Sequence, residues 1–186
     1  MLLDRQFAGT RCGRIDVSRF PLSRAQHLSE ALAYLWQAQT LRATVRKLCN
    51  AGNTVFIEYH PAHTKFLFRN PANLRVQWNP CLGLQDATGY LTPALLLGHE
   101  LGHAQFTADE RYAMLGCDRP QGFQAEAFGV EEARVIATVE APLVAELNAA
   151  RRAAGLSPLE TASRAQHQLG RMVGVAGPLD VPLTVS

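Results

Sequence analysis

The chain lacks long apolar runs and long runs of charge. No stretch approaches the roughly 18 consecutive apolar residues that a transmembrane helix needs, so we expect no membrane partner. The 18 basic and 16 acidic residues give a formal net charge of +2 without a run of either sign, which disfavours nucleic acid as a partner. The amino terminus carries several charges and no apolar run of signal-peptide length. Export through a general signal peptide is therefore not expected.

Cysteine is sparse, and its spacing is uninformative about metal binding. The four cysteines are far apart and include no Cys-x-x-Cys pair, which excludes a zinc ribbon and a dithiol redox motif. We therefore expect free thiols in a reducing cytosol at Cys12, Cys49, Cys81 and Cys117.

The chain does have enough apolar material for one sizeable core, because 47% of its 186 residues are hydrophobic. Residues 1–22 have mixed charge and weak periodicity, so we expect a flexible leader that would carry any secretion signal. Residues 23–186 are predicted to form a single domain.

The most informative motif is the pentad His99-Glu100-Leu101-Gly102-His103, which has the His-Glu-x-x-His arrangement of zinc hydrolases. On an α-helix, His99 and His103 lie about 40° apart and one turn from each other, close enough to share a metal ion. Glu100 lies between them in sequence, and its carboxylate suits a general base that takes a proton from the attacking water. The pentad predicts one catalytic zinc ion, with His99 and His103 as ligands and Glu100 as the catalytic residue.

The sequence around the pentad predicts a largely buried helix. Thr92 and Pro93 are typical of an N-cap and a first helical residue, and an apolar run leads from them into the pentad. Gly98 and Gly102 are poor helix formers, so we expect another backbone or a bound substrate to approach this helix closely. The non-functional alternative is a core helix with two satisfied histidines and a surface glutamate.

The remaining pattern predicts an α+β fold. Helical spacing over residues 22–48 indicates one long helix or two, and helical patterns recur over residues 129–152 and 159–173. Between them, β-branched and aromatic residues predict a three-stranded antiparallel meander formed by residues 54–60, 64–69 and 74–78. The predicted architecture is a zincin-like minimal metalloprotease, in which a small antiparallel sheet packs with the His-Glu-x-x-His helix and further helices.

An extended peptide substrate would pair with a strand at the edge of this sheet. Residues 78–85 are the nearest candidate for that edge. His60 and His63 flank Pro61 in a predicted hairpin turn, and we interpret them as turn residues that can face a substrate.

A catalytic zinc site has three protein ligands and one open position, so one more ligand is needed. Glu131 and Glu132 begin an otherwise apolar helical segment, where buried carboxylates need a cation. We favour Glu132, which shares a helix face with apolar residues such as Val135 and Val139. Glu131 is the alternative ligand, or it is exposed or bonds a ligating histidine. The structural alternative is that both acidic residues only favour a helix N-terminus.

Asp109 is a less favoured ligand. It lies six residues after His103, a spacing that some zinc enzymes use. That pattern needs a glycine three residues after the second histidine, and this chain has Phe106 there. A continued helix would carry Asp109 about 240° around the axis from His103.

A carbonyl hydrolase also benefits from a donor that faces the developing oxyanion. Tyrosine and arginine can both supply such a donor, although most residues of these two types only pack or lie on the surface. The candidates are Tyr112, Arg134, Arg151 and Arg152.

Three segments carry a resemblance to a known family. They are the pentad region 97–104, residues 129–136 with paired glutamates followed by Arg-Val-Ile, and residues 140–147 with a Glu-x-Pro sequence. Together they resemble the NleD-type zinc metalloprotease effectors, a family that includes the XopG-type effectors. The resemblance covers roughly residues 54–152.

The resemblance implies a zinc metalloendopeptidase of gluzincin type that a type III secretion system delivers into the host cytoplasm. The implied substrate is a host signalling protein such as a mitogen-activated protein kinase, and a secretion chaperone is a possible further partner. His99, His103 and one of Glu131 or Glu132 would bind Zn²⁺, with Glu100 as the general base. Arg151 or Arg152 would match a basic residue of the relatives, but the aromatic residue expected near it is absent here.

Two other functions stay open. The chain fits a bacterial zincin that acts inside the producing cell or as a toxin domain. It also fits a non-catalytic protein that retains the zincin fold and docks on a host protein. Replacing Glu100 distinguishes the docking protein from an enzyme, because the replacement removes hydrolysis and leaves the metal ligands in place. A biological effect that survives Glu100→Ala would favour docking.

Overall fold

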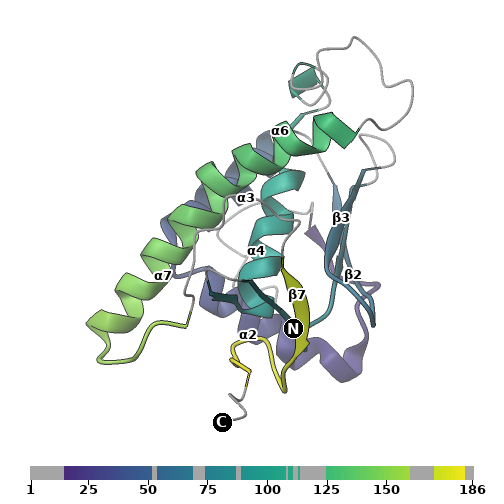
Figure 1. The fold of residues 1–186 in the computed structure, drawn as a ribbon. Helices are drawn as coiled ribbons and strands as arrows, with labels where there is room; N and C mark the ends of the chain where they lie inside the picture. Colours follow the sequence, from purple (N-terminus) through teal and green to yellow (C-terminus); the bar gives the residue numbers. More distant parts are fainter. Residues whose placement is uncertain are drawn as a thin grey trace.

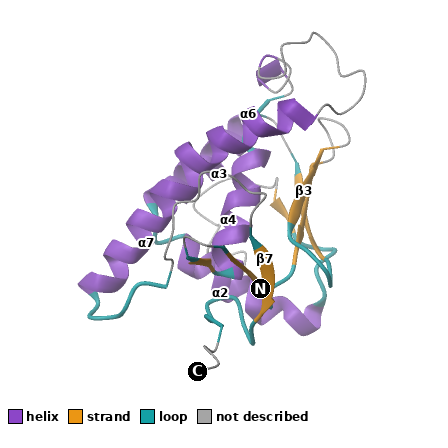
Figure 2. Ribbon diagram, in the orientation of Figure 1, coloured by secondary structure: helices purple, strands orange, loops and turns teal. Residues whose placement is uncertain are grey.

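The computed structural model describes residues 15–51, 54–68, 74–86, 89–107, 109–110, 113, 125–159 and 170–182. These residues form a mixed α+β fold with small sheets (Figures 1 and 2). The pentad helix α4 (Pro93–Ala104) lies in the middle, between the long α6–α7 helix and the sheet that contains β2 and β3. Among the described helices, none has the length and apolar character that a membrane crossing requires.

The predicted helical region after residue 22 forms two helices. A short 3-10 turn, η1 (Leu22–Arg24), leads into α2 (Ala25–Leu35), and α3 (Gln39–Asn50) follows after a turn. Their apolar faces supply buried leucines to the common core, and α2 packs directly on α4. The periodicity therefore predicted these helices correctly.

The first sheet contains the predicted strands in a different order. It has the order β1 (Ile15–Asp16), β2 (Val55–Tyr59), β4 (Leu74–Trp78) and β3 (Lys65–Phe68). Strands β2 and β4 are parallel, and β3 is antiparallel to β4 at the edge of the sheet. The predicted antiparallel meander is therefore wrong, although each of its strands exists.

The reason is the path of the chain between β2 and β3. The N–H of His60 donates to the carbonyl of Trp78 at 3.1 Å. Next to it, the Asn79 side-chain amide donates to the carbonyl of Pro61 at 2.6 Å. The connection thus crosses the end of β4 and leaves β3 on its far side. Leu74 and Val76 of β4 are buried, which agrees with the interior position of β4 between β2 and β3.

The predicted substrate edge at residues 78–85 is also wrong. Trp78 ends the interior strand β4. Residues 82–85 form β5 (Leu82–Gln85), which is the middle strand of a second sheet between β6 (Tyr90–Leu91) and β7 (Arg171–Gly174). The edge of the first sheet that contacts α4 is β3.

The C-terminal part of the chain differs from its predicted helix. Residues 171–173 belong to strand β7, which pairs antiparallel with β5, while residues 160–169 lie outside the described residues. Beyond β7, the carbonyl of Pro178 accepts a hydrogen bond from the N–H of Ala94 at 3.0 Å. This contact ties the C-terminal segment to the first turn of α4.

Part of the predicted leader belongs to the folded structure. Residues 1–14 lie outside the described residues, but Ile15 pairs with Val55 in the sheet. Phe20 is buried, and its ring stacks on Trp78 with 5.6 Å between the centroids. The sheet therefore holds Ile15 and Asp16, and the core holds Phe20.

The pentad helix begins as its sequence predicts. The Thr92 hydroxyl oxygen accepts a hydrogen bond from the N–H of Leu95 at 3.1 Å, and Pro93 is the first helical residue. The two glycines allow close packing. A Cβ at Gly98 would lie 2.9 Å from Leu143 Cδ1, and one at Gly102 would lie 2.9 Å from Val135 Cγ1. The close approach thus comes from side chains of neighbouring helices, and not from another backbone or a substrate as expected.

The helix predicted over residues 129–152 is present and longer. It runs through α6 (Ala125–Val135), a π-helical turn η2 (Ile136–Glu140) and α7 (Ala141–Ala153). Its buried residues include Val135, Val139 and Leu143, which face α4 and the core. This helix brings a series of glutamates to the pentad.

The cysteines depart in part from expectation. Cys81 is free, but Cys49 in α3 is disulfide-bonded. The expectation of free thiols is therefore wrong for Cys49. Disulfides persist mainly in oxidising compartments, so this bond does not support a reducing environment.

Candidate metal centre

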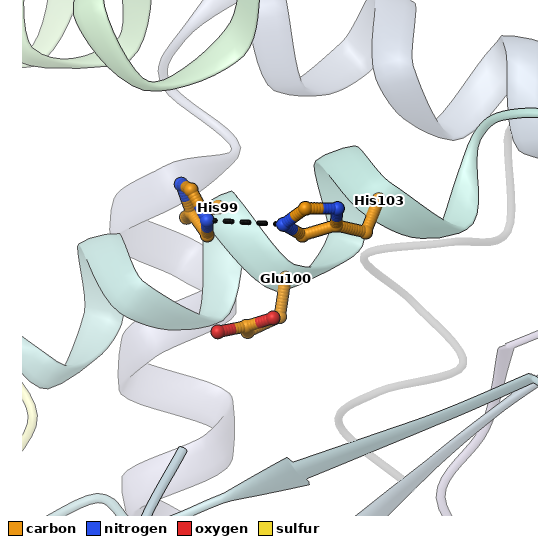
Figure 3. A group of neighbouring side chains, drawn as sticks. All are labelled: His99, Glu100 and His103. Carbon is orange, nitrogen blue, oxygen red and sulfur yellow. Dashed lines mark hydrogen bonds between the residues drawn. The ribbon is translucent and has the colours of Figure 1, made fainter. Parts of the chain in front are cut away.

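His99 and His103 lie one turn apart on α4, with their rings side by side (Figure 3). Their Nε2 atoms are 3.2 Å apart, and both residues are buried. Glu100 is also buried, and the three side chains offer ligand atoms that all lie within 4.8 Å of one another. The pentad thus forms a group that can bind a metal ion.

Glu132 from α6 completes a triangle with the two histidines. Its Oε2 atom lies 3.1 Å from Nε2 of His103 and 3.3 Å from Nε2 of His99. Both imidazoles therefore direct the same nitrogen toward one carboxylate oxygen. This is the position that we expected for the favoured third ligand.

Two further glutamates contact the opposite nitrogens of the rings. Glu131 Oε1 lies 3.0 Å from Nδ1 of His103, and Glu140 Oε2 lies 2.8 Å from Nδ1 of His99. Glu131 therefore occupies the position predicted for a residue that bonds a ligating histidine. Glu140 was not among the candidate residues from the sequence.

The triangle has the dimensions that zinc requires. Tetrahedral bonds of about 2.0–2.1 Å place neighbouring ligand atoms roughly 3.3–3.4 Å apart. The three observed separations are 3.2, 3.3 and 3.1 Å. Two imidazole nitrogens and one carboxylate oxygen are also a donor set that zinc uses in hydrolases. The residues therefore fit a zinc ion at this position.

The electrostatics of the centre favour positive charge. Burial by itself lowers the pKa of His99, but hydrogen bonds to Glu132 and Glu140 outweigh it and raise the pKa to about 10. Burial likewise lowers the pKa of His103, and its bonds to Glu131 and Glu132 produce a net increase. The buried or partly buried carboxylates around the two imidazoles thus stabilise protons or a cation between them.

Strand β3 lies against the centre. The ring of Phe66 stacks on His103, with 5.7 Å between the centroids and 12° between the planes. The edge of the first sheet is therefore in contact with a histidine of the pentad.

The structure places none of the described oxyanion-donor candidates, nor Asp109, in the contacts that form the metal centre. The Arg134 guanidinium lies over the Phe106 ring at 5.0 Å, and Arg151 Nε donates to the carbonyl of Ser157 at 2.6 Å. Arg152 and Asp109 are exposed. Tyr112 lies outside the described residues.

His60 and His63 lie in the connection between β2 and β3, but this connection is not the predicted hairpin turn, because β4 lies between the two strands. Their rings stack with 3.5 Å between the centroids. His63 Nε2 also lies 2.8 Å from the Gln77 side-chain oxygen. These contacts explain both histidines without a metal.

Comparison of the chain with protein-family models, curated proteins and solved structures finds no match. The geometry of the centre is therefore the basis of the function proposed below. The resemblance to the NleD-type effectors remains a prediction from the sequence.

Proposed function

We propose that this protein is a zinc-dependent endopeptidase with a zincin-like fold of the gluzincin type. The observation that carries the proposal is the triangle of His99 Nε2, His103 Nε2 and Glu132 Oε2, with sides of 3.1–3.3 Å, beside Glu100. His99, His103 and Glu132 are the ligands in this proposal, and Glu100 is the catalytic residue. One Zn²⁺ per chain would satisfy the site.

Zinc bound by this triangle would act as a Lewis acid toward a water molecule and the scissile carbonyl. The Glu100 carboxylate takes one proton from the attacking water as the new C–O bond forms. The same carboxylate then delivers this proton to the leaving nitrogen as the C–N bond breaks. Its place next to His99 on the buried helix holds it beside the ligand atoms throughout.

Substrate positioning falls to strand β3. This strand forms the edge of the first sheet that contacts α4, and Phe66 stacks on His103. A peptide that extends the sheet along this edge would run past the pentad, with its backbone held by strand pairing. Strand pairing recognises an extended backbone, so the proposed substrate is an unfolded or flexible segment of a protein.

The biological setting in this proposal follows the family resemblance. A host signalling protein is the substrate, and a type III secretion system delivers the enzyme. The compartment in which the protein acts needs a separate test, because Cys49 is disulfide-bonded and a reducing cytosol disfavours disulfides.

The test compares the zinc-loaded wild type with Glu100→Gln. Both are incubated with a mixture of extended peptides and with host-cell proteins, and new termini are identified by mass spectrometry. We expect cleavage by the wild type and a rate reduced by about 10²–10⁴-fold in the variant, with zinc content unchanged. A metal chelator should abolish the wild-type cleavage.

Two results would contradict the proposal. Equal cleavage by Glu100→Gln would remove the proposed general base. A zinc-loaded wild type that cleaves nothing, yet binds a host protein equally well with and without Glu100, would favour a docking protein.

A further inference from the structure

Glu140 is a fully buried carboxylate with a specific partner. Its relative exposure is 0%, as is that of His99, and its Oε2 atom lies 2.8 Å from His99 Nδ1. This is the ring nitrogen that faces away from the triangle, because His99 directs Nε2 toward Glu132 and His103. Glu140 therefore contacts the centre through a histidine rather than through the triangle itself.

The π-helical turn explains how Glu140 reaches this position. Glu140 lies eight positions after Glu132 on the same continuous helix, and a regular α-helix would rotate it about 80° away from the face of Glu132. A π-helical turn has about 4.4 residues, or about 82° per residue, so four steps through η2 reduce that angle to less than about 10°. The wider turn thus brings both glutamates to the face that contacts α4.

We infer that Glu140 is a positioning residue for the metal centre. With a metal ion bound, its carboxylate, 2.8 Å from Nδ1, would hold the proton of His99 on that nitrogen, which would leave Nε2 free of a proton and keep the ring turned toward the triangle. A carboxylate in this role also increases the basicity of the ligating nitrogen. This inference rests on the proposed function, since it assigns to Glu140 an effect on metal binding.

A merely structural role makes a different prediction. If Glu140 only satisfied a buried histidine, its loss would lower the stability of the fold and leave metal affinity unchanged. Glu146 provides the matched control, because it lies on α7 and accepts from the Thr40 N–H at 3.1 Å and the Thr40 hydroxyl at 2.6 Å. These bonds hold α3 and do not involve the pentad.

The experiment measures zinc affinity by competition with a chelator for the wild type, Glu140→Gln and Glu146→Gln. We expect a loss of about 10–100-fold in Glu140→Gln and wild-type affinity in Glu146→Gln. Unchanged affinity in Glu140→Gln, or an equal loss in both variants, overturns the inference. A wild type that takes up no zinc would instead defeat the proposed function itself.

A second measurement does not depend on the folding of a variant. Histidine nitrogen NMR of the zinc-loaded wild type reports which ring nitrogen carries the proton. The inference predicts a proton on Nδ1 of His99 that exchanges slowly with water, and metal coordination at Nε2. A protonated Nε2, with Nδ1 as the coordinating atom, would overturn it even if Glu140→Gln failed to fold.

Discussion

Replacing Gly102 by alanine should destabilise the fold and weaken the metal centre together. A Cβ at this position would lie 2.9 Å from Val135 Cγ1 and 3.2 Å from Val139 Cβ. Both valines are buried and β-branched, so their atoms cannot rotate out of the way at low cost. The helix that carries Glu132 would therefore have to move away from α4.

The magnitude follows from two opposing effects. Overpacking of a dense core costs typically about 1–3 kcal/mol. Alanine in place of glycine inside a helix returns about 1 kcal/mol. We therefore expect Gly102→Ala to lower the free energy of unfolding by about 1 kcal/mol. Zinc affinity should also fall, because Glu132 moves away from the two Nε2 atoms.

Gly129 is the matched control for this substitution. It lies within α6, and a Cβ there would meet nothing within 4 Å. Gly129→Ala should therefore raise the free energy of unfolding by about 0.5–1 kcal/mol and leave zinc affinity unchanged. Chemical denaturation of both variants without metal gives the comparison. If Gly102→Ala proved as stable as Gly129→Ala, the close contact between α4 and its neighbouring helix would be refuted.

Three further predictions concern the same helix. His99→Ala and His103→Ala should each lower the zinc content of the protein. They should also lower the melting temperature measured in the presence of zinc, because metal binding is coupled to folding. Unchanged zinc stoichiometry would contradict the assignment of these ligands. Zinc uptake near neutral pH should release at least about one proton, because the pKa of His99 is raised to about 10 and zinc binds the neutral ring. Zinc affinity should therefore increase as the pH rises toward that value. Calorimetry in buffers of different ionisation enthalpy would detect the released proton. Thr92→Ala should cost about 1 kcal/mol in chemical denaturation, because the hydroxyl caps the N–H of Leu95; no loss would show that the cap is not needed.

Local signals in the sequence predicted much of the fold. The N-cap at Thr92, the first-turn proline and the spacing of apolar residues each depend on neighbours within one or two helical turns. Strand pairing depends on distant residues instead. Nothing within residues 54–78 indicated that the connection after β2 would cross the end of β4, so the order of the strands was predicted incorrectly.

In the candidate site, too, the sequence predicted what depends on nearby residues and left open what depends on packing between helices. The spacing of the pentad was sufficient to bring His99, Glu100 and His103 together on one helix. The choice between Glu131 and Glu132 stayed open in the sequence, because adjacent residues differ only in their angle around the helix. In the structure, that angle places Glu132 at the Nε2 atoms and Glu131 at an Nδ1 atom.

Glu140 could not be found by periodicity. Helical spacing assumes about 3.6 residues per turn, and at that spacing Glu140 lies about 80° around the helix from Glu132. The π-helical turn changes this angle, and the pattern of residues in Ile136–Glu140 does not predict such a turn. The Glu-x-Pro sequence after the paired glutamates was the signal that pointed to this region.

The most direct test of the account is the zinc content of the purified protein, measured by elemental analysis after incubation with zinc. We expect about one zinc per wild-type chain, loss of that zinc in Glu132→Ala, and retention in Glu131→Ala at saturating zinc. A wild type without zinc, or a loss confined to Glu131→Ala, would contradict it.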